Sequence, residues 1–155
     1  YLYTVYMNSA LNNDMMFKPL AFVYPQDEMA KGVEDQLMVG DEIMIAPIYT
    51  QNANGRYVYL PEDMLFVKFL PDGTIAQEEL AKGLHYVKVA LNEVPLFIRK
   101  DRCIPVAENA NRAEDVSFDT VRLIGWKGAS FDLYNDDGFT QDYAGEGKYT
   151  HLTME

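Results

Sequence analysis

The sequence predicts a mainly β fold, an antiparallel β-sandwich preceded by a short helix-strand-helix segment. The first observation is composition: 48% of the 155 residues are hydrophobic and 13% aromatic, with 11 Tyr and 8 Phe, which is too apolar for a disordered chain and typical of strands. The second is a change of pattern. After Gly40 short apolar runs alternate with turn residues, whereas before Gly40 the apolar residues follow longer periods.

The first element is predicted to be a short amphipathic helix over residues 1–11. The polar residues Asn12-Asn13-Asp14 end its pattern. The chain opens with Tyr1 instead of Met, and residues 1–11 already have the character of a helix interior, which suggests a piece of a longer protein. The residues that share one helical face are Leu2, Val5, Tyr6, Ser9 and Ala10.

A buried strand and a second helix are predicted next. Residues 17–24 (FKPLAFVY) form a nearly continuous apolar run, which is typical of a strand covered on both faces, as parallel strands in α/β proteins are. Met29, Val33 and Leu37 then recur every four residues up to Gly40, which indicates a helix with a C-terminal glycine. Helix, strand and helix make an α/β fragment that is too small to stand alone.

The remainder of the sequence is predicted to be all-β. Residues 43–49 and 56–60 flank Asn54-Gly55, a pair that favours a hairpin turn because both central residues of that turn adopt positive φ. The polar, alanine-rich stretch 107–115 interrupts the strand pattern and predicts a subdomain boundary. The other predicted strands are residues 64–70 before the turn Pro71-Asp72-Gly73, then 84–91, 94–99, 121–126, 130–134 before the turn Asn135-Asp136-Asp137-Gly138, and 148–154.

Charge and cysteine content exclude several partners. The chain carries 13 basic and 24 acidic residues, a net charge of −11, and no Lys/Arg cluster stands out, so nucleic acid and anionic membranes are poor partners. No apolar run approaches the ~20 residues of a membrane span. The single cysteine, Cys103, has apolar flanks and is predicted to be a buried small residue. These features predict a soluble protein of the reducing cytoplasm.

Asp136 and Asp137 are the most conspicuous acids, but adjacent carboxylates do not suit glycoside cleavage. A retaining glycosidase holds its two carboxyl groups about 5 Å apart across the scissile bond, whereas neighbouring residues on a strand point to opposite faces. A structural turn is the preferred interpretation. An EF-hand calcium loop fails as well, because placing Gly138 sixth puts Leu133 first and Ala144 twelfth.

Other catalytic and metal motifs do not appear in the sequence. His85 and His151 are the only histidines, and neither has a Cys or a second His at ligand spacing, so zinc is disfavoured. No Gly-x-Ser-x-Gly elbow and no glycine-rich phosphate loop is present. We therefore predict no catalytic, cofactor-binding or metal-binding residue and no cofactor in this chain.

A cluster of aromatic residues has two interpretations. Such rings could form a platform on which a sugar stacks, but aromatic residues at strand spacing are more often core residues or cross-strand pairs, and we prefer the second interpretation. The residues concerned are Tyr57, Tyr59, Tyr86, Phe131 and Tyr134.

Three segments carry a family resemblance. The first is Tyr1 to Thr4 (YLYT) followed by Lys18-Pro19-Leu20. The second and most specific is Asp35 to Pro47 (DQLMVGDEIMIAP). The third is Val94 to Pro105 (VPLFIRKDRCIP), followed by Leu133 to Gly138 (LYNDDG). In order and spacing, these segments resemble the region after the catalytic acid in family 31 glycoside hydrolases of the α-glucosidase type.

The resemblance implies a division into three parts. Residues 1–40 would be the terminal helix, strand and helix of a catalytic (β/α)8 barrel, residues 41–106 a proximal C-terminal β-sandwich, and residues 107–155 a distal C-terminal β subdomain. The aspartates that act as nucleophile and acid/base in that family lie upstream, so no catalytic residue can be carried over to this chain.

The function implied is that of the C-terminal, non-catalytic portion of a retaining α-glucosidase, which hydrolyses terminal α-linked glucose from oligosaccharides. Its partner would be the catalytic barrel of the same protein, the substrate of the full-length enzyme would be an α-glucoside oligosaccharide, and the isolated chain would be inactive. An apolar patch around residues 17–24 would then be exposed and would favour self-association.

The sequence departs from the family pattern at three places. Lys18 stands where the family usually has arginine and Val23 where it often has glutamate. Lys100-Asp101 stands where the family usually has two glycines, and this puts the turn geometry in doubt because Lys and Asp resist positive φ.

Two rival interpretations of the function are a free-standing carbohydrate-binding β-sandwich and a structural domain of an unrelated enzyme.

Overall fold

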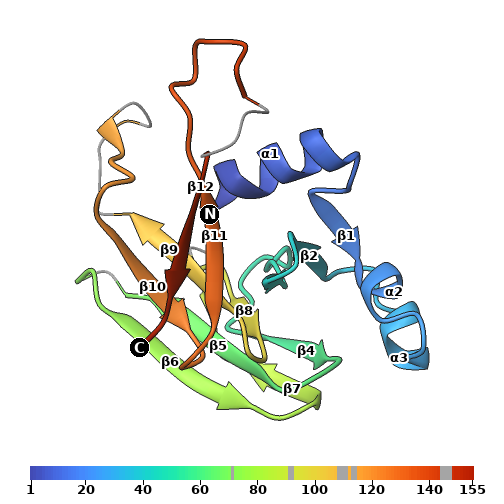
Figure 1. The fold of residues 1–155 in the computed structure, drawn as a ribbon. Coiled ribbons are helices and arrows are strands. Elements are labelled where there is room, and N and C mark those ends of the chain that lie inside the picture. Colours follow the sequence, from blue (N-terminus) through green and yellow to red (C-terminus); the bar gives the residue numbers. More distant parts are fainter. Residues whose placement is uncertain (71, 91–92, 108–111, 113–114, 144–147) are drawn as a thin grey trace. The chain divides into compact units, whose positions relative to one another are not determined.

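The computed structural model describes residues 1–70, 72–90, 93–107, 112, 115–143 and 148–155 (Figure 1). Its contacts divide the chain into two compact units. One, the central unit, is Phe17–Lys100, and the other, the terminal unit, joins Tyr1–Met16 with Asp101–Glu155. The fold is mainly β with antiparallel sheets, which confirms the predicted class.

The central unit contains two antiparallel sheets. The second sheet pairs β4 (Arg56–Leu60) with β7 (Gly83–Val87). The first sheet has, in spatial order, β1 (Phe17–Pro19), β2 (Leu37–Val39), β3 (Ile43–Ile45), β8 (Leu96–Arg99), β5 (Met64–Phe69) and β6 (Ile75–Leu80).

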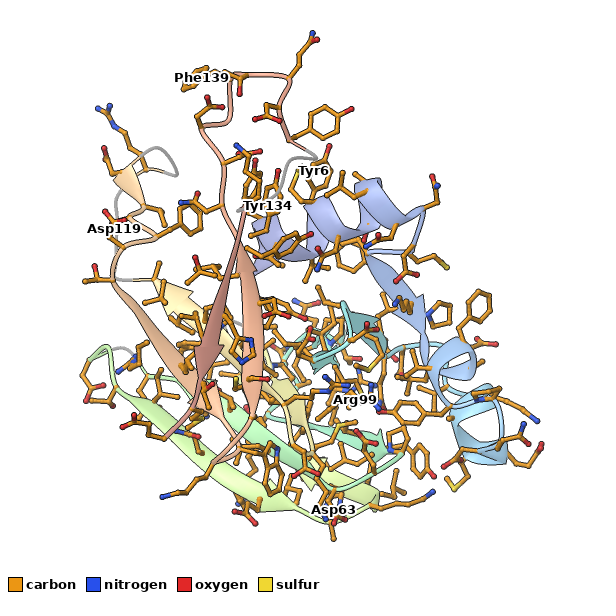
Figure 2. The ribbon with its side chains drawn as sticks, viewed as in Figure 1. Tyr6, Asp63, Arg99, Asp119, Tyr134 and Phe139 are labelled. Carbon is orange, nitrogen blue, oxygen red and sulfur yellow. The ribbon has the colours of Figure 1, made fainter. Side chains whose placement is uncertain are left out.

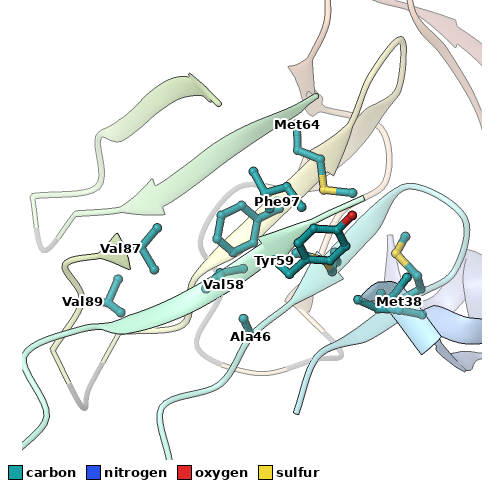
Figure 3. Close-up of a cluster of buried hydrophobic side chains, with 12 residues drawn as sticks. Met38, Ala46, Val58, Tyr59, Met64, Val87, Val89 and Phe97 are labelled. Carbon is teal, nitrogen blue, oxygen red and sulfur yellow. The ribbon is translucent and has the colours of Figure 1, made fainter. Parts of the chain in front are cut away.

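Both sheets of the central unit contribute to one hydrophobic core (Figure 3). Val58 and Val87 come from β4 and β7 of the second sheet. Met38, Met64 and Phe97 come from β2, β5 and β8 of the first sheet. Strands β2, β3, β4 and β8 each bury two or three consecutive residues. Because neighbouring side chains on a strand point to opposite faces, both faces of these strands are covered. Burying a side chain of this size contributes roughly 1.5–3 kcal/mol, so this core is a main source of stability.

The prediction of a long buried strand over residues 17–24 is wrong. Strand β1 covers only Phe17–Pro19 and pairs antiparallel with β2, and the short helix α2 (Leu20–Val23) follows at once. Of this segment only Leu20 is fully buried. An apolar run alone does not distinguish a strand from a helical turn, and here Pro19 marks the point where the backbone changes.

The predicted helix from Met29 towards Gly40 is also wrong for most of its length. Helix α3 covers only Glu28–Lys31 and ends at Gly32, and residues 37–39 are strand β2. Gly40 has φ of 64° and serves the turn between β2 and β3 instead of ending a helix. The requirement for glycine was thus identified correctly, but the element was not.

The hairpin predicted at Asn54-Gly55 does not form. Strand β3 pairs with β2 and β8, and β4 pairs with β7. Gly55 is nevertheless required, because a Cβ there would lie 2.4 Å from the carbonyl oxygen of Val87 on the neighbouring strand. The turn at Asp72-Gly73 does connect two paired strands, β5 and β6, and the second of these was not predicted. Strand β6 ends the sheet order and exposes Gln77, Glu78 and Glu79.

The terminal unit begins with helix α1 (Leu2–Asn12), which confirms the first predicted element. Asn13 ends the helix in the left-handed conformation with φ of 53°, as its side chain allows. The predicted apolar face is only partly right, because Val5 is buried together with Thr4 and Met7, whereas Leu2 and Tyr6 are exposed. The helix is apolar on two sides, so periodicity alone could not select the buried one.

Two antiparallel strand pairs complete the terminal unit. They are β9 (Cys103–Ala107) with β10 (Val121–Gly125), and β11 (Ser130–Tyr134) with β12 (Tyr149–Thr153). The strands at 121–126, 130–134 and 148–154 were predicted close to these bounds. Cys103 is fully buried among apolar residues, which confirms its predicted role.

The boundaries of the two compact units fall after residues 16 and 100, whereas the predicted parts were 1–40, 41–106 and 107–155. Strands on both sides of residue 40 share one sheet, and β9 extends to Ala107. The predicted boundary stretch 107–115 lies for the most part outside the described residues. The assignment of the first forty residues to a barrel stays a prediction.

Candidate functional site

A groove of about 590 Å³ lies beside the β4–β7 pair in the central unit. Its lining combines aromatic rings with carboxylates. A smaller hollow of about 210 Å³ shares Asp35, Tyr49 and Tyr57 with it and adds Arg56. The lining residues that matter chemically are Tyr49, Tyr57, Tyr59, Leu84, Glu28, Glu34 and Asp35. We call this surface the tyrosine groove.

Strand alternation positions the tyrosines. Tyr57 and Tyr59 occupy one face of β4 and Val58 the other, and of these three residues Val58 and Tyr59 belong to the core whereas Tyr57 is exposed. Tyr57 lies opposite Tyr86 of β7, with ring centroids 5.2 Å apart and an interplanar angle of 69°. Tyr57 is 65% exposed and Tyr86 53% exposed. Two large rings therefore contact each other edge to face at the protein surface, a geometry that aromatic pairs prefer.

Tyr49 is held at the groove by the partly buried guanidinium of Arg56. The side chain of Arg56 is only 12% exposed and its Nη2 lies 2.5 Å from Oδ2 of Asp35. The Arg56 guanidinium also lies 5.7 Å from the centroid of the Tyr49 ring, and its Nη1 donates to the carbonyl oxygen of Pro47 at 2.7 Å. The Tyr49 hydroxyl donates to the same Asp35 Oδ2 at 3.2 Å. Tyr49 is thus fixed although it is 72% exposed.

Tyr59 forms the buried end of the groove. Its hydroxyl donates to Oδ2 of Asp27 at 2.7 Å, and Lys82 Nζ donates to the same oxygen at 2.8 Å. The other oxygen of Asp27 accepts from the backbone N–H groups of Met29 and Ala30, which caps helix α3. Asp27 therefore ties α3 to the β4–β7 pair beside the groove.

These contacts shift the pKa values of both Asp27 and Tyr59. Hydrogen bonds from Lys82, then from Tyr59, hold the pKa of Asp27 well below its ordinary value. Burial, then the hydrogen bond to Asp27, raises the pKa of Tyr59. At neutral pH the carboxylate is ionised and the phenol is neutral, so the cluster is a stable ionic anchor.

The five aromatic residues considered from the sequence do not form one platform. Tyr57 and Tyr86 are exposed and adjacent, as a platform requires. Tyr59, Phe131 and Tyr134 are buried, as the preferred core interpretation stated. Tyr49 was missed as part of the surface, because its apolar flank made it look like the end of a strand.

Asp136 is a structural residue of the terminal unit, as the turn interpretation stated. Its Oδ1 accepts from the Tyr3 hydroxyl at 2.6 Å and from the Gly138 N–H at 3.0 Å, and its Oδ2 accepts from the Tyr134 hydroxyl at 2.9 Å. The hydrogen bond from Tyr3 is the main cause that lowers the pKa of Asp136. The carboxylate thereby joins helix α1 to the end of β11.

Asp137 orders the next part of the same turn. Its Oδ1 accepts from the backbone N–H groups of Phe139 and Thr140, both at 3.0 Å. These bonds lower its pKa. Phe139 projects from the loop and is almost fully exposed (Figure 2). Each of the two aspartates thus accepts hydrogen bonds from the backbone of its own turn.

The two histidines are placed separately within their own units. His85 lies on β7, where its Nε2 is 2.6 Å from the carbonyl oxygen of Ala81. His151 lies on β12, with Nδ1 2.7 Å from Oδ1 of Asp132. Among the described residues no group of three or more His, Cys, Asp or Glu side chains could hold a metal ion. The predicted lack of catalytic, cofactor and metal residues stays a prediction.

No helix in the described part of the chain is both long enough and apolar enough to span a bilayer.

The comparisons with known proteins first define a class: the relatives and structures named below are enzymes that act on glycosides. The glycosyl hydrolase family 31 C-terminal domain matches residues 13–104, which is more than half of the chain. The chain belongs to glycosyl hydrolase family 31 and contains its C-terminal domain. This confirms the resemblance inferred from the sequence motifs.

Curated relatives match nearly the whole chain. An alpha-xylosidase of Saccharolobus solfataricus is 31% identical over 96% of this chain and 20% of its own length. Alpha-glucosidase 2 of Bacillus thermoamyloliquefaciens is 29% identical over 100% of this chain and 19% of its own length. The chain thus spans about a fifth of these relatives.

Solved structures agree with the fold. A family 31 dextranase of Flavobacterium johnsoniae, complexed with glucose, superposes with a TM-score of 0.72 and 27% identity over 92% of this chain and 18% of that chain. A family 31 alpha-xylosidase of Xanthomonas citri superposes with a TM-score of 0.73 over 96% of this chain and 16% of that chain. The latter is 19% identical and shows the fold alone.

Proposed function

We propose that this chain is the C-terminal, non-catalytic portion of a retaining α-glucosidase, and that it supports the catalytic barrel of the same protein. The full-length enzyme would hydrolyse terminal α-linked glucose from oligosaccharides, with its catalytic aspartates outside this chain. The observation that carries the proposal is the match of a C-terminal domain to residues 13–104, together with coverage of only about a fifth of each relative.

The residues of the most specific motif support a structural role. Gln36 and Asp35 bind the backbone and the side chain of neighbouring segments, and Asp41 pairs with Lys18 at 2.8 Å. None of these carboxylates is presented as a catalytic pair, because each already has a cationic partner within the central unit. A motif used in this way supports a scaffold and not a reaction centre.

Exposed apolar side chains support contact with another part of the protein. Phe22 is 66% exposed, and Phe17 is also exposed in the same unit. We propose that this patch packs on the catalytic barrel, and that residues 1–40 complete that barrel. Strand β1 lies at an edge of its sheet, a position from which a further strand can extend it. The isolated chain would then self-associate through the patch, which sedimentation at several concentrations measures.

The enzymatic assignment is tested by comparing two proteins. The full-length protein should hydrolyse maltose or isomaltose, and the isolated chain should give no turnover. Turnover by the isolated chain would refute the division of roles. Parallel assays on an aryl α-glucoside and an aryl α-xyloside distinguish the two activities named for the relatives.

A cytoplasmic location is the final part of this proposal. Its support is the composition of the sequence, which contains a single cysteine, Cys103, and the complete burial of that side chain. A free-standing carbohydrate-binding module remains the alternative function, and the family match favours the domain of a larger enzyme over it.

A further inference from the structure

We infer that the tyrosine groove beside β4 and β7 is a binding site for an α-linked glucan chain. The choice of an α-glucan rests on the proposed function, whereas the presence of a carbohydrate site rests on the geometry of the groove. The site would belong to the C-terminal domain itself and would take two or more consecutive sugar residues.

The arrangement of the rings suits a chain of pyranoses. The C–H groups on one face of a pyranose make an apolar surface that stacks on an aromatic ring. Tyr86 is not part of the groove lining, but its ring contacts that of Tyr57 at an interplanar angle of 69°, so it extends the groove with an exposed face that is not coplanar with Tyr57. Consecutive α-linked glucose residues are also rotated relative to each other, and a curved chain can therefore place successive sugars on successive rings.

The third ring is preorganised. Tyr49 is fixed by the guanidinium of Arg56 at 5.7 Å from its centroid and by the hydrogen bond of its hydroxyl to Asp35 at 3.2 Å. Arg56 is itself held by Asp35 and by the Pro47 carbonyl. A side chain that is already ordered loses little conformational freedom when a ligand binds, and this favours affinity.

The polar lining suits a neutral, hydroxyl-rich ligand. Glu28, Glu34 and Asp35 line the groove beside the rings, and ionised carboxylates accept hydrogen bonds from sugar hydroxyls. The same negative charge disfavours nucleotides and other anions, in a chain whose net charge is −11. The volume of about 590 Å³ lies within the range of about 300–1,000 Å³ found for small-molecule sites.

The lining argues against a protein occupant. The centres of protein–protein interfaces are depleted of Asp and Glu, whereas three carboxylates line this groove. The exposed side chains of Phe17 and Phe22, which do not line the groove, are the better candidates for packing against protein.

The test uses the full-length protein in native gels that contain dextran or soluble starch. The double variant Tyr57→Ala/Tyr86→Ala should lose most of the retardation caused by the glucan, with the dissociation constant raised about tenfold. Tyr57→Phe keeps the ring and should bind within about twofold of the wild type. Phe139→Ala removes an even more exposed ring from the terminal unit and should not change retardation.

Kinetics supply the second readout. The double variant should keep the wild-type kcat/KM for maltose and should lose severalfold in kcat/KM for a long α-glucan. Retardation equal to that of the wild type in the double variant would overturn the inference, and so would a wild-type protein that shows no retardation. If the full-length protein binds glucan through the tyrosines but hydrolyses neither maltose nor isomaltose, the proposed function fails and the binding site stands.

Discussion

The side chain of Gln36 forms two hydrogen bonds with the backbone of Tyr59, as a neighbouring strand would. Oε1 of Gln36 accepts from the Tyr59 N–H at 2.8 Å, and its Nε2 donates to the Tyr59 carbonyl oxygen at 2.7 Å. Both residues are buried. One amide therefore fixes the position of β4, and with it the face that carries Tyr57.

Replacing Gln36 by Leu should destabilise the chain by about 3 kcal/mol, because the buried N–H and C=O of Tyr59 would both lose their partners. Urea unfolding measures the change in free energy. Gln77→Leu on the exposed face of β6 is the matched control and should stay within about 0.5 kcal/mol of the wild type. Equal effects of the two substitutions would contradict the role of Gln36.

Gly125→Ala should cost at least about 2 kcal/mol. The φ of Gly125 is +150°, and a Cβ there would lie 2.3 Å from the Arg102 carbonyl oxygen and 2.5 Å from Cys103 Cα. Gly128→Ala isolates the cost of backbone strain from that of a steric clash, because Gly128 has φ of +82° but no atom lies within 4 Å of the added Cβ. Its cost should be near 1 kcal/mol. Thermal unfolding of both variants gives the comparison.

Asp101→Gly should stabilise the chain by up to about 1 kcal/mol. Asp101 has φ of 58°, so the turn keeps the positive φ that a glycine pair permits, although the family usually has glycine at this position. Asp tolerates this conformation better than most residues, whereas Asp101→Val should be clearly destabilising. Lys100→Gly is the control, since Lys100 is not among the positive-φ residues and its Nζ lies 3.1 Å from Asp63. A gain in stability from Lys100→Gly equal to that from Asp101→Gly would contradict this reasoning.

The contribution of Asp27 should depend on pH. Because its pKa is lowered from 3.8 in the folded chain, its ionised form stabilises the fold fully above about pH 4, and this stabilisation is lost as the pH falls further. Asp27→Asn keeps a good cap for α3 but removes the charge facing Lys82. The variant should therefore be less stable than the wild type at pH 7, and the difference should shrink towards pH 2. A difference that does not change with pH would rule out the charge as its cause.

Alkaline titration should reveal two tyrosines in the terminal unit, Tyr3 and Tyr134, that ionise at higher pH than an ordinary tyrosine. The hydrogen bond to Asp136 is the main cause that raises the pKa of Tyr3 to about 12, and burial is the main cause that raises the pKa of Tyr134 to about 12. The folded state holds these protons more tightly than the unfolded state, so stability should fall as the pH rises above 10. Ultraviolet absorbance follows the ionisation. In Asp136→Asn the ionisation of Tyr3 should begin at lower pH, and unchanged titration would argue against the carboxylate as its cause.

Much of the fold could be predicted because local patterns decide it. The period-two strands at 121–125, 130–134 and 149–153 and the turn at Gly73 depend on residues close in sequence. The segment 17–24 was misassigned because an apolar run is compatible with strand or helix until its neighbours are known. The hairpin at Gly55 failed for a similar reason, since the partner of β4 is β7, almost thirty residues away.

The tyrosine groove was predictable only in part. Strand spacing identified Tyr57 and Tyr86 as members of an aromatic cluster, but it did not predict their exposure, because Tyr59 on the same face of β4 is buried. Tyr49 could not be assigned in this way, because its position is set by the Arg56 guanidinium and by Asp35, which lie apart from it in sequence. Contacts between distant residues leave no periodic signal.

Strand β6 affects how the sheet can grow. Glu78 and Glu79 stand exposed on this edge, and a second strand that approached with the same sequence would bring like charges opposite one another. Ribbon-like aggregation through this edge is therefore opposed electrostatically, also while the protein is being synthesised. A high salt concentration, which screens charges on the surface, would weaken that protection.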